Sequence, residues 1–434
     1  MKRLVLFLAF MGFAVSVFAE GMFDAGVYLR LRQEYFDNAF DFNDDSGIFK
    51  DDNYFRIKAS LWGKFNFSED VNFFVKLTAE PKIAIYDDGA IAKGNDVWDD
   101  EIFFDNLYLD VRNLFGMPVD IRLGRQDFLM THGEGFVIMD GTPYDGSRSV
   151  YFNAAKVTVR FNEKNSIDLI YADNPQVDEY LPVINWQDRT VVKTDENAFI
   201  LYVKSKAGDN LSLEPYYIYK FEDNPAAPAR KLTLNTVGNR AVFDFDPWRL
   251  RGELAYQFGE YKDKSDREAW GGYVYLTRFF KETKLSPSVE VGYAYLSGES
   301  DPTAGDDSGW DPVFSKWPWI SELYIFGYAI ERGEPAYWTN LQLWRIKADM
   351  KLADKTGLSL AYNYLKANEA QKTGAPFFGT GDERGHLAHV ILTQKFTKNV
   401  DGHLHFEYFK PGDFYASDNR DDAIFLRWQL QMSF

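Results

Sequence analysis

From Leu426 onward, the last segment of the chain alternates between apolar and polar side chains. The apolar positions are Ile424, Leu426, Trp428, Leu430, Met432 and Phe434, and the positions between them hold Phe425, Arg427, Gln429, Gln431 and Ser433. Neighbouring side chains of a β-strand point to opposite faces, so most of one face suits an apolar medium and most of the other suits water. The segment therefore predicts a strand that separates lipid from water.

Both ends of the chain predict export. Residues 1–19 combine the basic start Met1–Arg3, the apolar run Leu4–Val17 and a small residue at Ala19, after which we expect cleavage of a signal peptide. The alternative is a membrane anchor, but the run is shorter than the roughly 20 residues that span a bilayer. An aromatic last residue, Phe434, resembles the signal read by the barrel-assembly machinery of bacterial outer membranes, which we expect as a partner.

Composition narrows the class. Hydrophobic residues make up 46% and aromatic residues 17% of the chain, yet no further apolar run is long enough for a membrane helix. A barrel wall exposes only every second residue to lipid and places aromatic residues at its rims, which accounts for both values. Cysteine is absent, so disulfides and thiolate sites are excluded. We expect no nucleic-acid partner, no cofactor and no metal.

Alternating segments recur along the whole mature chain, residues 20–434, without a linker. We predict one all-β domain, a transmembrane antiparallel β-barrel of about 18 strands, with a count of 16 or 20 left open because Ile320–Ala329 also resembles a strand. Every second connection is short, which is typical of bacterial barrels with both termini in the periplasm of an outer-membrane protein. A soluble β-sandwich is the alternative fold.

The polar faces of several predicted strands carry basic side chains, which we assign to the lumen. These residues are Arg30, Arg32, Arg56, Lys58, Arg122, Lys156, Arg160, Arg249, Arg251, Arg345 and Lys347. Rings of Arg and Lys favour anions. Alternatively, these cations pair with carboxylates of the wall, Glu34, Asp110, Asp120, Glu253 and Asp349, and leave the lumen unselective.

The negative charge of the chain, formally −17, falls largely in the predicted outer loops. We expect these acidic residues at the rim, where they contact lipopolysaccharide through divalent ions or keep the rim soluble. Asp306, Asp307 and Asp311 belong to the longest loop, Gly298–Tyr337. Its tryptophans fold either inward as a sugar-stacking constriction or outward as a protomer contact.

One stretch resembles a known family. Leu123–Phe128 reads Leu-Gly-Arg-Gln-Asp-Phe, Gly133–Phe136 reads Gly-Glu-Gly-Phe, and Asp140–Arg148 reads Asp-Gly-Thr-Pro-Tyr-Asp-Gly-Ser-Arg. This pattern is similar to the alginate export family of outer-membrane barrels. The resemblance implies passage of an anionic polysaccharide through an arginine-lined constriction. It carries over Arg125 and Arg148 as pore residues, with Gln126, Asp140 and Asp145 as the rim motif.

The same motif has a purely structural interpretation, in which Asp145 and Arg148 form an ion pair that stabilises a turn. The chain also departs from the family pattern, because its longest predicted periplasmic turn, Arg112–Pro118, is too short to cap the pore.

The basic lumen and the family resemblance together predict a passive outer-membrane channel for anionic sugars or polysaccharide, with a general diffusion porin as the alternative. An enzyme is not expected, since the few histidines, among them His386 and His389, do not converge with a nucleophile.

Overall fold

The computed structural model describes residues 22–46, 51–87, 101–128, 131–139, 151–187, 190–223, 230–299, 305–371 and 377–434. The predicted signal peptide and the motif residues Asp140, Asp145 and Arg148 lie outside these residues. No helix in the described parts of the chain is long and apolar enough to cross a bilayer.

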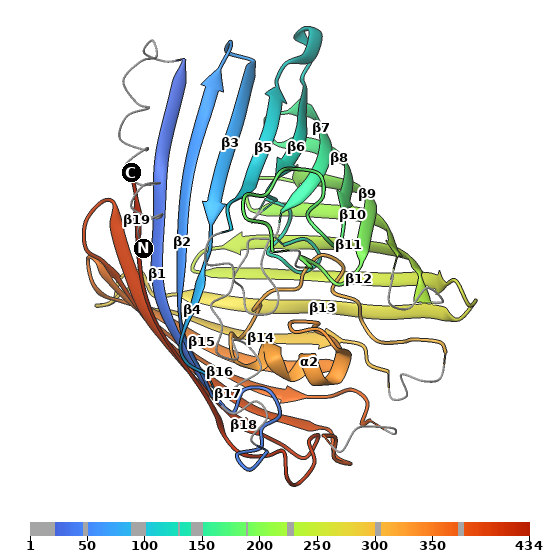
Figure 1. Cartoon of the computed structure of the whole chain (residues 1–434), viewed down its shortest axis with the longest axis vertical. Coiled ribbons are helices and arrows are strands. Elements are labelled where there is room, and N and C mark those ends of the chain that lie inside the picture. The colour runs from blue at the N-terminus through green and yellow to red at the C-terminus, as the bar shows by residue number, and fades with distance from the viewer. Residues whose placement is uncertain are drawn as a thin grey trace.

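The described residues contain a single antiparallel sheet that closes on itself (Figure 1). β1 pairs with β2 on one side and with the last strand, β19, on the other. The strands are β1 (Phe23–Asp37), β2 (Asp51–Asn66), β3 (Val71–Ala79), β4 (Lys82–Asp87), β5 (Phe103–Val111), β6 (Val119–Gln126), β7 (Phe152–Asn162), β8 (Asn165–Asn174), β9 (Asp195–Lys206), β10 (Leu211–Asp223), β11 (Leu232–Phe245), β12 (Trp248–Tyr261), β13 (Asp266–Phe279), β14 (Ser288–Leu296), β15 (Leu341–Ala353), β16 (Thr356–Lys366), β17 (Glu383–Lys395), β18 (Val400–Pro411) and β19 (Ala423–Ser433).

The barrel has 18 strands although 19 segments are distinguished, because β3 and β4 are two parts of one strand. Both pair with β2, and only Glu80 and Pro81 separate them. Proline has no backbone N–H to donate, so the ladder is interrupted there, while the Pro81 carbonyl still accepts a hydrogen bond from Ile57 N at 3.0 Å. The predicted all-β barrel and its strand count are confirmed.

The connections at one end of the barrel are short, and those at the other end are mostly longer. The connection from β7 to β8 is only Glu163–Lys164, whereas β14 and β15 are separated by Ser297–Asn340. A short helical turn, η2 (Leu114–Gly116), lies at the short-turn end. The two ends of the described chain meet at this end too, where Val27 and Phe434 exchange backbone hydrogen bonds of 2.9 Å.

The outer face of the wall carries the alternate apolar side chains. Leu123, Phe199, Leu254, Ile346 and Leu404 are all exposed there. Their sequence neighbours on the same strands are polar or small, apart from the buried Ile200, and face inward. The wall therefore has the apolar outer surface that a lipid bilayer requires.

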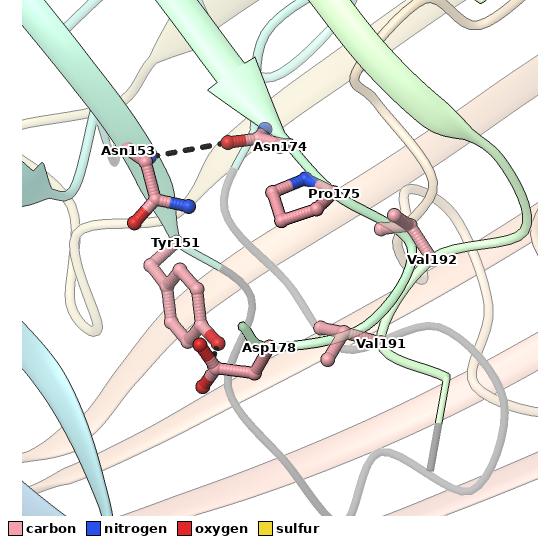
Figure 2. Close-up of a pocket in the computed structure, with 7 residues that line it drawn as sticks. All are labelled: Tyr151, Asn153, Asn174, Pro175, Asp178, Val191 and Val192. Carbon is pink, nitrogen blue, oxygen red and sulfur yellow. Dashed lines mark hydrogen bonds between the residues drawn. The ribbon is translucent and has the colours of Figure 1, made fainter. Parts of the chain in front are cut away.

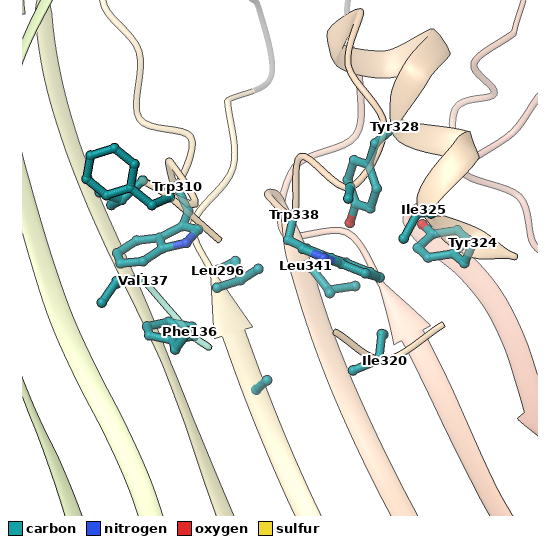
Figure 3. Packing of buried hydrophobic residues seen from close by; sticks show 14 of the residues in the cluster. Phe136, Val137, Leu296, Trp310, Ile320, Tyr324, Ile325, Tyr328, Trp338 and Leu341 are labelled. Atoms are coloured by element: carbon teal, nitrogen blue, oxygen red, sulfur yellow. The ribbon is translucent and has the colours of Figure 1, made fainter. Parts of the chain in front are cut away.

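The long β14–β15 connection folds into the barrel. It contains η4 (Tyr324–Phe326) and α2 (Gly327–Arg332), so the segment Ile320–Ala329 is partly helical and is not an extra strand. Trp310, Tyr324, Tyr328 and Trp338 are buried in its core (Figure 3). Because this much aromatic surface is removed from water inside the ring, the hydrophobic effect holds the connection inward.

The inward connection also packs against a second inward segment, residues 131–139, which follows β6. The ring of Phe136 stacks on Trp310 with centroids 5.1 Å apart, and Ile138 forms a parallel bridge with Phe314. Together the two segments narrow the barrel interior.

Candidate pore-lining site

The first basic cluster lies on β1, β2 and β3. Arg30 pairs with Glu80 at 2.7 Å, and Arg32 and Arg56 each pair with Glu34 at 3.2 Å. Further pairs join Lys58 to Glu80 and Asp105 at 3.7 and 3.8 Å, and Lys76 to Asp105 at 2.7 Å. Lys76 also lies 3.9 Å from Asp127, which is more exposed than the lysine. The predicted lumen cations of this wall are thus held by carboxylates.

In the other pairs of this cluster the cation is the more exposed partner. The side chain of Glu80 is 3% exposed and that of Arg30 is 15% exposed, and the values for Asp105 and Lys76 are 2% and 22%. The same order holds on β8 and β9, where Asp168 is 2% and Lys204 35% exposed. In each of these pairs the carboxylate is thus the less exposed partner.

Other predicted cations are paired as well. Arg122 makes a two-pronged ion pair with Asp110, at 2.6 and 2.8 Å, and lies over the ring of Tyr108. The remaining pairs join Arg160 to Asp120, Arg249 to Asp244 at 2.6 Å, Arg251 to Glu134 and Glu290, and Lys347 to Asp349 at 2.9 Å. Pairing of wall cations with Glu34, Asp110, Asp120 and Asp349 therefore occurs, as the alternative interpretation of the sequence expected. Glu253 instead accepts hydrogen bonds from Tyr216 and Tyr273.

Two predicted cations differ from the rest. Within the described residues, Arg345 and Lys156 have no carboxylate at ion-pair distance. Lys156 stands directly across from Arg122 on the next strand, whereas Arg345 lines a cavity. Arg345 is therefore the basic side chain best placed to meet a dissolved anion.

That cavity lies between the inward connection and the wall of β15 to β19 and has a volume of about 360 Å³. Its charged and titratable lining comprises Arg345, Lys347, Arg427, Glu322, Glu407, His389, His403 and His405. Besides the three imidazoles, the lining thus contains three cations and two carboxylates. Trp319 of the inward connection adds an aromatic side chain to the opposite side.

A second cavity, of about 300 Å³, lies at the short-turn end of the same wall. His403 lines both cavities. The charged lining of the second is Lys351, Lys355, Lys395, Asp354 and Asp401, so cations again outnumber carboxylates. Each of the two cavities thus has one more cation than carboxylate in its lining.

The motif residue Arg125 is placed differently from the sequence prediction. Arg122 and Arg125 are three residues apart in an unbroken strand, so they point to opposite faces, and Arg125 shares its face with the exposed Leu123. Its guanidinium is buried in an ion pair with Asp178, at 2.6 and 3.1 Å, and lies 3.7 Å from the ring centroid of Tyr151. Arg125 thus fastens the β8–β9 connection to the wall and does not line the lumen.

Figure 2 shows Asp178 beside Tyr151 at a small pocket of this joint, where the tyrosine hydroxyl donates to the carboxylate at 2.5 Å. Gly124 has φ +121° and lies close to the backbone of β5. A Cβ at this position would lie 2.2 Å from the Leu107 carbonyl oxygen, so only glycine fits here. Gln126 is fully buried and donates to the carbonyls of Gly124 and Ala154. The Gly-Arg-Gln element is therefore structural in this chain.

The inward segments carry charged groups that the sequence did not place inside. Asp307, which we expected at the acidic rim, is buried and pairs with Arg267 at 2.9 Å. Burial by itself raises the pKa of Asp307, but Arg267 and Arg332 outweigh it and lower that pKa to about 2. Burial lowers the pKa of His132 to about 4, although Asp168 opposes the shift. Asp307 is therefore ionised and His132 neutral at physiological pH.

Comparison with known proteins agrees with this architecture. The chain matches the model of the family described as Alginate export over residues 22–425. No curated protein matches the sequence. Similar solved structures include Pseudomonas aeruginosa OpdQ (12% identity, TM-score 0.61, 95% of this chain and 97% of that chain) and P. aeruginosa OccK2 (OpdF) in complex with glucuronate (10% identity, TM-score 0.59, 95% and 98%). Acinetobacter baumannii OccAB4 is similar too (12% identity, TM-score 0.60, 95% and 98%).

The fold and its interior define an outer-membrane β-barrel of the porin type. The chain belongs to the alginate export family, as the motif around Leu123–Phe128 predicted. Both the family and the fold are those of transport channels.

Proposed function

We propose that the protein is a passive channel for anionic sugars or polysaccharide, with the basic interior as the selective element. The observation that supports this most is the order of exposure within the ion pairs. Glu80 and Asp105 are almost fully buried, whereas Arg30, Lys58 and Lys76 extend past them toward water. A carboxylate in the pore meets the cations first.

The unpaired Arg345 and the cations of the two cavities add to this field along the β15–β19 wall. A guanidinium binds a carboxylate with two parallel hydrogen bonds, which suits a sugar acid. Family membership and the glucuronate complex of OccK2 (OpdF), a structural neighbour, support the same chemical class.

We further propose the orientation that bacterial barrels share, with the long connections outside the cell and both termini in the periplasm. The outer face then contacts membrane lipid and lipopolysaccharide. β19, which ends at Ser433 beside the terminal Phe434, is the segment we propose for recognition by the barrel-assembly machinery.

The alternative, a general diffusion porin, is favoured by the pairing of most wall cations. Single channels in planar bilayers distinguish the two functions when oligomers of a uronic acid are compared with neutral oligosaccharides of equal length. We expect the uronate oligomers to interrupt the current at lower concentration, with an effect that fades as salt is raised. Equal interruption by both sugars would establish the diffusion porin.

A further inference from the structure

A compact group of metal-binding side chains lies on the wall of the larger cavity. His389 of β17 stands across from Glu407 of β18, and His405 lies two residues before Glu407 on the same face. Each offers one ligand atom, and these atoms all lie within 4.8 Å of one another. The imidazole rings of His389 and His405 are nearly parallel, with centroids 6.3 Å apart.

Two buried polar atoms in this group lack hydrogen-bond partners among the described residues. His405 Nε2 lies 3.0 Å from Glu407 Oε1 but is not aligned for a hydrogen bond. Asn363 Oδ1 also has no partner, although the amide nitrogen of Asn363 donates to His389 Nε2 at 2.8 Å. A bound ion or an ordered water would satisfy these two atoms.

The inward connection fixes the position of Glu407. Its carboxylate accepts hydrogen bonds from the Ser321 hydroxyl, from Glu322 N at 2.9 Å and from Leu323 N at 3.2 Å. Metal-binding carboxylates in proteins are held by such surrounding hydrogen bonds. The carboxylate is therefore oriented by residues far away in the sequence, independently of the two histidines.

We propose that His389, His405 and Glu407 form a binding site for a divalent transition-metal ion of the zinc class. Two neutral imidazoles and one carboxylate are a ligand set that Zn²⁺ accepts, with a fourth position left for water. The adjoining cavity supplies the space for that water. Small rotations of the side chains bring the three ligand atoms to metal-bond distance.

The electrostatic surroundings weaken the site without removing it. Arg345, Lys347 and Arg427 line the same cavity and repel a dication. Arg427 is itself paired with Glu34 and Glu322, so its charge is largely compensated. The ligand chemistry, rather than net charge, selects the ion, and hard cations such as Mg²⁺ are not expected to bind.

The test is Zn²⁺ titration by calorimetry of the refolded full-length mature chain in detergent, without a polyhistidine tag. His389→Ala and His405→Ala remove ligands, while His386→Ala is the matched control, because His386 lies on the opposite face of β17 beside Tyr362. Glu407→Gln keeps the hydrogen-bonding shape toward the inward connection and removes the charge. Circular dichroism verifies the fold of each variant, and the visible spectrum of bound Co²⁺ reports nitrogen and oxygen ligation.

We expect one Zn²⁺ per chain in the wild type and in His386→Ala. Affinity should fall at least tenfold in each ligand variant, since even the loss of a supporting hydrogen bond around a metal ligand costs about 10- to 100-fold. The site is refuted if the wild type binds no more Zn²⁺ than a His389→Ala/His405→Ala double variant. It is equally refuted if His386→Ala loses as much affinity as the ligand variants.

Discussion

Two walls of the same barrel hold their cations in opposite ways. On β1 to β3, the basic side chains are locked by Glu34, Glu80 and Asp105, which are buried behind them. On β15 to β18, Arg345 has no carboxylate partner within the described residues and lines an open cavity. The first wall carries a network of ion pairs, and the second carries a basic side chain that is free to bind an anion.

The difference shows what a buried carboxylate does in a pore. The carboxylate neutralises the net charge of the pair. Because the cation is the more exposed partner, water still meets the positive charge first. The buried pair is sensitive to loss of either partner, since the survivor is left uncompensated away from water. For the cation without a carboxylate partner, we expect loss of the side chain to affect what passes more than the stability of the fold.

The largest expected effect follows from breaking the network of ion pairs. Glu34→Gln leaves Arg32, Arg56 and Arg427 without their shared carboxylate. We expect the free energy of unfolding to fall by about 3–5 kcal/mol, the cost of breaking a buried ion pair. Urea unfolding in detergent micelles measures it.

The control for that experiment is Asp209→Asn, which removes an exposed pair with Lys164 in a short turn. Its unfolding midpoint should equal that of the wild type. If Glu34→Gln unfolds at the same urea concentration as this control, the network has no structural role.

A smaller effect is expected on the open wall. Arg345→Ala removes a positive charge from the cavity without stranding a described carboxylate, so stability should change little. The anion-to-cation permeability ratio should fall about threefold, as expected for loss of one charge beside a watery path. Reversal potentials at low salt measure this ratio.

Arg278→Ala is the matched control, since this arginine lies outside the lumen beside the ring of Trp248. Its permeability ratio should match the wild type. A drop in the control as large as that of Arg345→Ala would assign the effect to net charge of the whole protein instead of the cavity wall.

The smallest effect concerns the inward connection at moderate acidity. The pKa of Asp307 is lowered from 3.8 to about 2, so its pairing with Arg267 contributes fully above pH 3.8 and is lost as the pH falls through about 2. Hydrogen exchange of residues 305–320 should therefore show equal protection at pH 6 and pH 4, after correction for intrinsic exchange rates. Protection lost between these values would show that another group controls the connection.

The sequence predicted the wall well and the interior poorly, for physical reasons. Every second side chain of a barrel strand contacts lipid and is therefore apolar. Alternation of the kind seen at Ile424–Phe434 thus identifies strands reliably. Alternation along β5 predicts that Asp105 faces outward. A register shift between Lys76 and Leu77, where β3 pairs with β5, turns Asp105 inward instead. Such an irregularity leaves no mark in the polar pattern.

The placement of Arg125 was available from spacing alone, because it stands three positions after Arg122. The polar pattern assigned Arg122 to the lumen, and the family motif added Arg125 against that signal. An inward fold of the longest loop was one of the two alternatives that its tryptophans allowed, and the sequence could not choose between them. The gathering of His389 with His405 was not predictable, since it depends on which distant strands the closed ring brings together.

The central claim, that the interior presents positive charge to the water it encloses, is tested most directly by the reversal potential of the wild-type channel in a tenfold gradient of KCl. The account predicts anion selectivity that is strongest in dilute salt and weakens as the Debye length falls from about 10 Å at 0.1 M to about 3 Å at 1 M. Cation selectivity in dilute salt would contradict it.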